Sequence, residues 1–229
     1  MKTLLLAVCA LAGVAYSAAA QEAPAFDPAA TARAVLEKGG ATEFFEIVPD
    51  DSFATVRHRA SGLTCGWGPN DTGGVTVFPV MDGVVRGDDV GCVHETPFGV
   101  HTLYATRYPP KMTAKAALAE AVLGIKTRWP KAKAVRPARP SGIAAHMAAE
   151  MPPSQSAQFL INEQGRAQMT RVNLVQIDGW TFKARYSGAV GMDSRADIVW
   201  VMALRDPLKS RGLPPYDKGP LAGPPPTAD

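Results

Sequence analysis

The spacing of apolar residues changes after residue 43, and this change is the strongest constraint on the fold. In the stretch ATVRHRAS, Val56 and His58 fall on one face of an extended chain, and Arg57 and Arg59 fall on the other. A period of two residues is typical of a half-buried β-strand. The pattern continues to residue 108 through short runs separated by turn-rich segments. Strands are expected at 44–48, 54–61, 63–67, 75–81, 89–94 and 100–108.

A second block of alternating residues covers 156–188. Asp178-Gly179 lies between NLVQI and WTFKARY, and this dipeptide predicts a two-residue β-hairpin turn. On the strand that follows, Trp180 and Phe182 share one face, while Lys183 and Arg185 share the other. The segment NEQGR predicts another turn inside the block. This block is therefore expected to form antiparallel strands as well.

Three segments have helical features. Asp27 is a good N-cap for a helix over 28–38, and Thr113 caps an amphipathic helix that Pro130 ends. The segment 196–209 is apolar nearly all round, and its length favours a helix over a strand, whereas 144–151 fits either. We predict an α+β fold, a single antiparallel sheet covered by two or three helices. The sequence leaves open whether the two strand-rich blocks form one sheet or two.

The first twenty residues have the features of a signal peptide. Lys2 precedes an apolar stretch over 3–16, and Ala18-Ala19-Ala20 provides the small residues of a cleavage site before Gln21. Cys9 lies inside the apolar stretch and does not end it, unlike a lipidated cysteine. No later run approaches the 18 apolar residues of a membrane span. We expect a periplasmic or secreted protein that is cleaved after Ala20 and has no membrane span.

The remainder is expected to form a single domain over 21–211, with an internal connection at 131–142. Residues 212–229 include six prolines and are expected to be disordered. Lys2 is one of the 24 basic residues, so the mature chain has 23 against 21 acidic residues. A net charge near +2 gives no reason to expect binding to nucleic acid.

Two cysteines, Cys65 and Cys92, remain after cleavage. An even number of cysteines in an exported protein favours a disulfide, and with two there is only one pairing. In GLTCGWGPND, Leu63, Cys65 and Trp67 share one phase, so the Cys65 side chain is expected to point inward beside an aromatic ring. The pair is interpreted as a structural disulfide rather than a reactive thiol.

Histidines supply the candidates for metal binding. His58, His94 and His101 lie in the first strand-rich block, but oxidation of the two cysteines would remove the thiolate ligands beside them. Met147 and Met151 have the i, i+4 spacing that can bind a cuprous ion, although methionines at this spacing usually pack. No cofactor is predicted, and metal handling, of copper or zinc, is kept as an alternative.

Basic residues suggest one candidate ligand site. Arg57 and Arg59 share a strand face, and with Arg107 they could bind an anionic ligand such as a cell-envelope polymer. The sequence contains no GxSxG, SxxK or P-loop motif. We therefore expect a non-catalytic binding or envelope-associated domain, with an unidentified envelope protein or ligand as partner. A small hydrolase using histidine and carboxylate groups is the alternative, with His58 and His101 as the first candidates.

Overall fold

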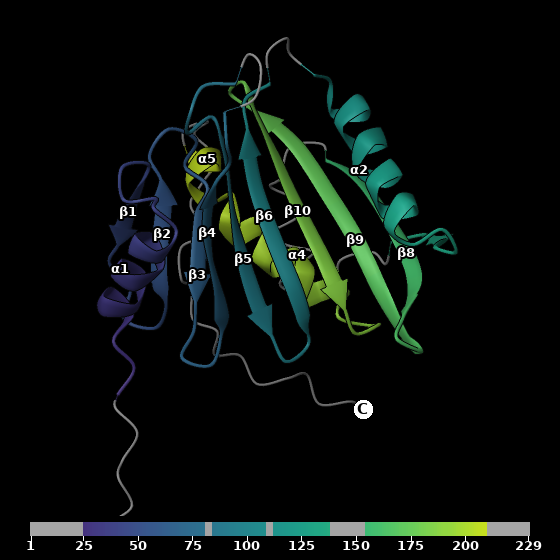
Figure 1. The fold of residues 1–229 in the computed structure, drawn as a ribbon, viewed down its shortest axis with the longest axis horizontal. Coiled ribbons are helices and arrows are strands. Elements are labelled where there is room, and N and C mark those ends of the chain that lie inside the picture. Colours follow the sequence, from purple (N-terminus) through teal and green to yellow (C-terminus); the bar gives the residue numbers. More distant parts are fainter. Residues whose placement is uncertain (1–24, 81–83, 109–111, 138–153, 210–229) are drawn as a thin grey trace, which may run out of the picture.

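The structure, a computed structural model, describes residues 25–80, 84–108, 112–137 and 154–209. It confirms an α+β fold built from antiparallel strands (Figure 1). The described strands form a three-stranded sheet, in the order β1-β2-β3, and a seven-stranded sheet, in the order β4-β5-β6-β10-β9-β8-β7. The two strand-rich blocks thus join in one large sheet, and the first three strands form a small sheet of their own.

The elements follow the predicted order. The helices are α1 (Pro28–Lys38), α2 (Ala114–Arg128), α4 (Asp193–Ala203) and α5 (Arg205–Lys209). The small sheet contains β1 (Phe45–Val48), β2 (Ala54–His58) and β3 (Thr64–Trp67). The large sheet contains β4 (Thr72–Val77), β5 (Asp89–Thr96), β6 (Gly99–Thr106), β7 (Lys133–Val135), β8 (Gln155–Glu163), β9 (Arg166–Ile177) and β10 (Trp180–Gly188).

Local sequence signals explain most element boundaries. Asp27 accepts a hydrogen bond from the Ala30 N–H and begins α1, and Thr113 does the same for α2 through Ala116. The predicted hairpin turn at Asp178-Gly179 joins β9 to β10, and both residues have positive φ, 49° and 82°. Such a turn matches the twist of the strands that it connects. These boundaries follow from short-range chemistry.

Other boundaries differ from the prediction. The strand expected at 75–81 instead covers Thr72–Val77, because Thr72 and the two following glycines already pair with β5. The connection at 131–142 contains β7, which adds an edge strand to β8. The segment 196–209 is helical, as expected, but α4 begins at Asp193 and a break at Leu204 separates it from α5.

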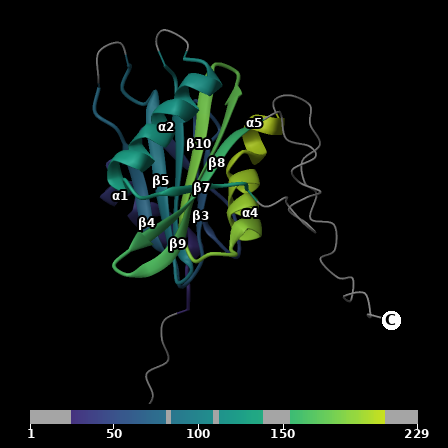
Figure 2. The ribbon, with the colours of Figure 1, turned by 90° about the vertical axis from the view of Figure 1, so that its right-hand side faces the viewer.

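The large sheet separates two unequal layers. Helix α2 lies against β8 and β9 on one face, whereas α4 and α5 lie on the other (Figure 2). The small sheet shares that second side, and α1 packs against β1, β2 and β4. The main core includes buried side chains from both sheets and from α4, among them Trp67, Phe182 and Trp200. The small sheet and α4 thus lie on the same face of the large sheet, with β3 against β5 and α4 against β6.

Several predictions concern residues outside the described ranges. They are the signal peptide over 1–20, the tail over 212–229, the methionine pair Met147 and Met151, and the end of the 131–142 connection. The described part of the chain contains no helix with the length and apolarity needed to cross a bilayer.

Candidate functional site

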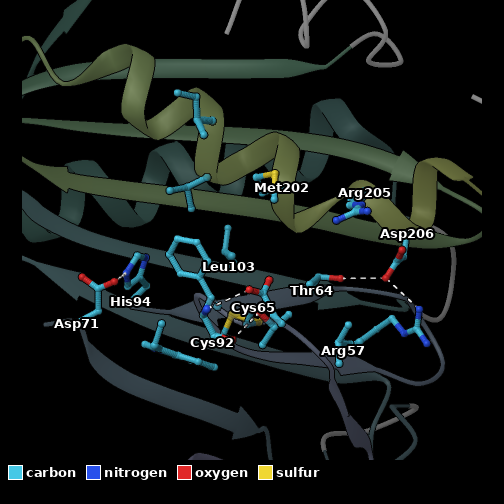
Figure 3. A pocket seen from close by; sticks show the side chains of 18 of the residues that line it. Arg57, Thr64, Cys65, Asp71, Cys92, His94, Leu103, Met202, Arg205 and Asp206 are labelled. Carbon is cyan, nitrogen blue, oxygen red and sulfur yellow. Dashed lines mark hydrogen bonds and ion pairs between the residues drawn. A yellow bond between two sulfur atoms is a disulfide. The ribbon is translucent and has the colours of Figure 1, made fainter. Parts of the chain in front are cut away.

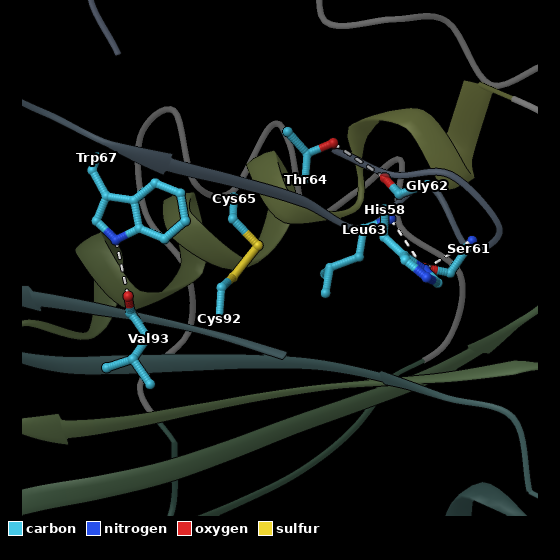
Figure 4. Close-up of a disulfide and its surroundings, with 9 residues drawn as sticks. All are labelled: His58, Ser61, Gly62, Leu63, Thr64, Cys65, Trp67, Cys92 and Val93. Atoms are coloured by element: carbon cyan, nitrogen blue, oxygen red, sulfur yellow. Dashed lines mark hydrogen bonds between the residues drawn. A yellow bond between two sulfur atoms is a disulfide. The ribbon is translucent and has the colours of Figure 1, made fainter. Parts of the chain in front are cut away.

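A disulfide joins the two sheets. Cys65 of β3 is bonded to Cys92 of β5, as predicted, and both residues are buried (Figure 4). Beside it, the Trp67 indole N–H donates a hydrogen bond of 2.9 Å to the Val93 carbonyl on β5. Leu63, Cys65 and Trp67 all point inward, which confirms the phase expected from GLTCGWGPND. The disulfide and the indole together hold β3 against β5, the second strand of the large sheet.

The same disulfide forms part of the floor of a cleft. This cleft has a volume of about 760 Å³ and lies between β2–β3, β5–β6 and the helices α4 and α5 (Figure 3). Leu103 extends the apolar floor, and Ile198, Met202 and Phe53 line the sides although they are 38%, 43% and 49% exposed. Large apolar side chains that remain exposed around a concave surface are typical of a binding site.

One end of the cleft contains a network of charged groups. The Asp206 carboxylate accepts a hydrogen bond of 3.0 Å from Arg57 and forms an ion pair of 3.2 Å with Lys209. The Thr64 hydroxyl lies 3.4 Å from the same carboxylate. Burial alone would raise the pKa of Asp206, but the hydrogen bonds from Arg57 and Lys209 hold it below its usual value. The carboxylate is therefore ionised at neutral pH, and this end presents a fixed, internally neutralised polar group.

The other end contains a carboxylate–histidine pair. The Asp71 carboxylate lies 2.8 Å from Nε2 of His94, and it also accepts a hydrogen bond from the Gly68 N–H. Burial acts to raise the pKa of Asp71, and the contacts with His94 and Gly68 outweigh it and lower that pKa. The cleft thus has polar groups at its two ends and an apolar floor between them.

A buried ion pair fixes the helix that forms one wall. The Arg171 guanidinium of β9 lies 2.8 Å from the Asp197 carboxylate of α4, and the two side chains are 8% and 6% exposed. Asp197 precedes Ile198, which faces the cleft from the same helix. The position of α4 relative to the large sheet, and with it the width of the cleft, depends on this contact.

The structure brings two of the three candidate histidines together. His94 and His101 are cross-strand partners in the β5–β6 hairpin, with ring centroids 5.9 Å apart. His58 lies elsewhere, 2.8 Å from the Ser61 hydroxyl and between the rings of Phe45 and Trp180. Within the described ranges, no three His, Cys, Asp or Glu side chains are arranged to hold a metal ion. The geometry gives no support to the metal-handling alternative there.

Burial also argues against the two histidines chosen first for catalysis. His58 and His101 are 1% and 3% exposed, so neither can reach a substrate in solution. Desolvation lowers the pKa of each to about 4, with Arg107 contributing at His58, and His94 and Arg195 at His101. Both rings are therefore neutral core groups at pH 7. Among the histidines that the structure describes, His94 is the one that lines the cleft.

These pKa values predict that the protein loses stability as the pH falls. A buried neutral histidine stabilises the fold fully above its unfolded-state pKa of 6.5, and this stabilisation is lost progressively down to about pH 4. Between pH 6.5 and pH 5 we expect the free energy of unfolding to fall by about 1 kcal/mol per pH unit for each histidine. Urea unfolding at several pH values measures the slope, and His58→Phe should roughly halve it. A flat profile over this interval would contradict the prediction.

The three candidate arginines lie around one cavity but are already paired. Arg57, Arg59 and Arg107 line a cavity of about 420 Å³ on the outer side of β2. Glu46 pairs with both Arg57 and Arg59, and Asp88 lies 3.7 Å from Arg107, which also stacks on the Trp180 ring. An anionic ligand would have to displace these carboxylates. The predicted basic site is therefore present in space but is neutralised.

Comparison with known proteins identifies no family. No protein-family profile and no curated protein matches the chain. Among solved structures, the chain is similar to the crystal structure of a protein of unknown function from Pseudomonas aeruginosa. That similarity has 8% identity and a TM-score of 0.34, and it covers 67% of this chain and 94% of the other. A likeness this weak indicates nothing about activity, so function has to be argued from the cleft.

The cleft has the size of a small-molecule site and a mixed lining. Its floor is apolar, whereas its rim includes the charged residues Asp50, Asp51, Arg195 and Arg205 in addition to the charged groups at its two ends. The helix residues that line the cleft could not be identified from the sequence, because Ile198 and Met202 lie in a segment that is apolar on nearly every side and was expected to be buried. Their i, i+4 spacing was the available signal, because it places both on one helix face.

Proposed function

We propose that this protein is a non-catalytic binding domain of the bacterial cell envelope that holds a lipid-like ligand in the cleft between β3 and α4. The observation that carries the proposal is the cleft itself, about 760 Å³, with a floor of Leu103 and the disulfide and exposed apolar side chains around it. An acyl chain has no polar groups to satisfy, so such a floor suits it, and the polar ends can contact a headgroup. The signal-peptide features and the disulfide support export.

Introducing a charge into the cleft tests this function. We expect Met202→Glu to weaken binding of the neutral apolar dye N-phenyl-1-naphthylamine by about tenfold or more, because the carboxylate would have to be desolvated. Met202 is 43% exposed, so the variant should fold normally. Fluorescence titration measures the affinity, and saturated fatty acids should displace the dye.

Leu123→Glu is the matched control. Leu123 is 66% exposed on α2, across the large sheet from the cleft, and its replacement should leave dye affinity unchanged. Two results would contradict the proposal: no saturable dye binding to the unaltered protein, or equal affinity of Met202→Glu and Leu123→Glu. Displacement by an apolar peptide but not by fatty acids would assign the cleft to a protein partner instead.

The Asp71–His94 pair favours a hydrolase as the second candidate. A carboxylate that orients a histidine is the arrangement of a general base, and both side chains line the cleft. Cys65 and Cys92 cannot act as nucleophiles because they are oxidised to each other. The reaction would therefore use an activated water. In that case His94→Gln would abolish hydrolysis of an apolar ester and leave dye binding intact.

A further inference from the structure

The other face of the large sheet contains a second concave region. Two adjoining cavities of about 340 Å³ and 670 Å³ lie beside α2, and Tyr104 and Arg185 line both of them. We call this region the α2 groove. It is on the α2 side of the large sheet, whereas the lipid-like ligand is proposed for the α4 side (Figure 2). Any function of the α2 groove is therefore independent of the proposed cleft.

Two cations project into the α2 groove from one strand. Lys183 and Arg185 are two residues apart on β10, so their side chains share a face, as their alternation with Phe182 and Ala184 predicted. Both are partly buried. The Lys183 ammonium lies 4.2 Å from the centre of the Tyr104 ring, and the Arg185 guanidinium lies 5.1 Å from that of Trp129. Aromatic rings stabilise a cation partially but leave its charge uncompensated.

Neither cation has a carboxylate partner among the residues that the structure places. No ion pair is formed by Lys183 or Arg185 there, and one terminal nitrogen of Arg185 is buried without a hydrogen-bond acceptor. Asp89 and Glu120 act on Lys183, and Glu163 acts on Arg185, without forming an ion pair with either cation, although Glu120 lines the smaller cavity and Glu163 the larger one. The partly buried Arg57 and the buried Arg171 differ, since both contact carboxylates directly. An unpaired buried guanidinium nitrogen is a costly feature unless something else satisfies it.

The electrostatics of the α2 groove favour an added negative charge. Burial lowers the pKa of Lys183; Asp89 and Glu120 offset this only in part, and Arg185 adds to it. Burial also lowers the pKa of Arg185, with Tyr104 and Glu163 acting to raise it and Arg128 at the end of α2 acting to lower it. Both charged forms are therefore disfavoured in the unliganded protein, chiefly by burial, and an anion between the two cations would stabilise them.

We propose that the α2 groove binds a small organic anion whose carboxylate or phosphate group lies between Lys183 and Arg185. The smaller cavity beside Lys183 can take the charged group, and the larger cavity can take the rest of the molecule. Thr181 also lines the smaller cavity, and its hydroxyl, which accepts a hydrogen bond from Gln176, can still donate one to an anion. Two cavities of this size suit a small molecule better than a polymer, whose backbone would need a long continuous track.

Thermal unfolding with a panel of anions tests the proposal. The probes are citrate, galacturonate, glucose 6-phosphate and inorganic phosphate, each compared with sodium chloride at the same ionic strength. We expect at least one probe to raise the unfolding temperature in a saturable manner. Whether the effective probes are carboxylates or phosphates identifies the type of anion that the α2 groove binds. Calorimetry should show that Lys183→Gln and Arg185→Gln each weaken it by about tenfold or more, the effect of losing one charge-assisted hydrogen bond.

The unliganded stability of the variants provides a second readout. Because Lys183 and Arg185 repel one another, Lys183→Gln should unfold at the same or a higher temperature than the unaltered protein without ligand. Lys126→Gln, an exposed cation on α2 outside the groove, is the matched control and should retain full anion affinity. The proposal is wrong if no probe exceeds sodium chloride, or if the Lys183 and Arg185 variants bind as the control does. A response to heparin alone would assign the groove to a polymer.

Discussion

Replacing both Cys65 and Cys92 by alanine will lower the free energy of unfolding by about 3 to 4 kcal/mol. The disulfide closes a loop with a sequence separation of 27 residues, and this cost is the loop-closure entropy that the unfolded chain regains. For a domain of this size the unfolding temperature should fall by roughly 7–14 °C. Urea and thermal unfolding of the oxidised protein and the double variant measure both quantities.

Reduction provides the control for this result. A reducing agent should bring the unaltered protein to the stability of the double variant and leave the variant itself unchanged. The loss should be concentrated in the small sheet, so amide exchange in β2 and β3 should accelerate more than exchange in β9 and β10. Equal stability of the oxidised and reduced proteins would show that packing alone, including the Trp67–Val93 hydrogen bond, holds the two sheets together.

Breaking the buried Arg171–Asp197 pair should have an effect of similar size. We expect Asp197→Ala to cost about 3–5 kcal/mol, because it leaves the Arg171 guanidinium buried without this carboxylate. Replacing both residues together, as Arg171→Met with Asp197→Leu, should recover most of the loss, since two apolar side chains of similar volume need no desolvated charge. Urea unfolding of the single and double variants gives both values.

An exposed ion pair provides the matched control. Arg128 and Glu163 lie 3.2 Å apart at the surface, and Glu163→Ala should change stability by less than about 1 kcal/mol. Because Asp197 anchors the helix that carries Ile198 and Met202, Asp197→Ala should also weaken dye binding in the cleft. Unchanged dye affinity in a destabilised Asp197→Ala protein would mean that α4 keeps its position without this contact.

Local chemistry explains which parts of the fold could be predicted. The inward phase of Leu63, Cys65 and Trp67 follows from alternation, and the β9–β10 turn follows from Asp178-Gly179. The disulfide was predictable because the two cysteines that follow the expected signal peptide allow only one pairing. The closeness of His94 and His101 could also have been deduced, since a hairpin turn at Pro97-Phe98 makes them cross-strand partners.

The division into two sheets could not be predicted in the same way. The strands β3 and β4 both alternate, and nothing local indicates that β3 ends one sheet while β4 begins another. Gly73 has a φ of 141°, and a side chain there would collide with the Val93 carbonyl, so the close approach of β4 to β5 needs this glycine. Which strands pair with one another depends on packing between residues far apart in the sequence, and the periodicity of the sequence carries no information about this packing.

The candidate site was the least predictable part for the same reason. An apolar helix such as α4 can be fully buried or can leave one face open. The outcome depends on how the contact between Asp197 and Arg171 of β9 positions the helix relative to β6 and β3. The arginines of the predicted basic site were also misjudged for this reason. In the sequence, Arg57 and Arg59 look like an unpaired basic face, whereas in the structure Asp206 and Glu46 lie beside them and neutralise their charge.

The floor of the cleft is itself a product of oxidation. Cys65 and Cys92 contribute to that surface as one covalent unit. In a reducing compartment they would be two separate thiols, and no disulfide would cross-link the two sheets. The finished binding surface would then arise only where thiols are oxidised. If the chain is exported, as its first twenty residues suggest, ligand would be captured after crossing the membrane and never during synthesis. Compartment and binding competence would be coupled by a single bond.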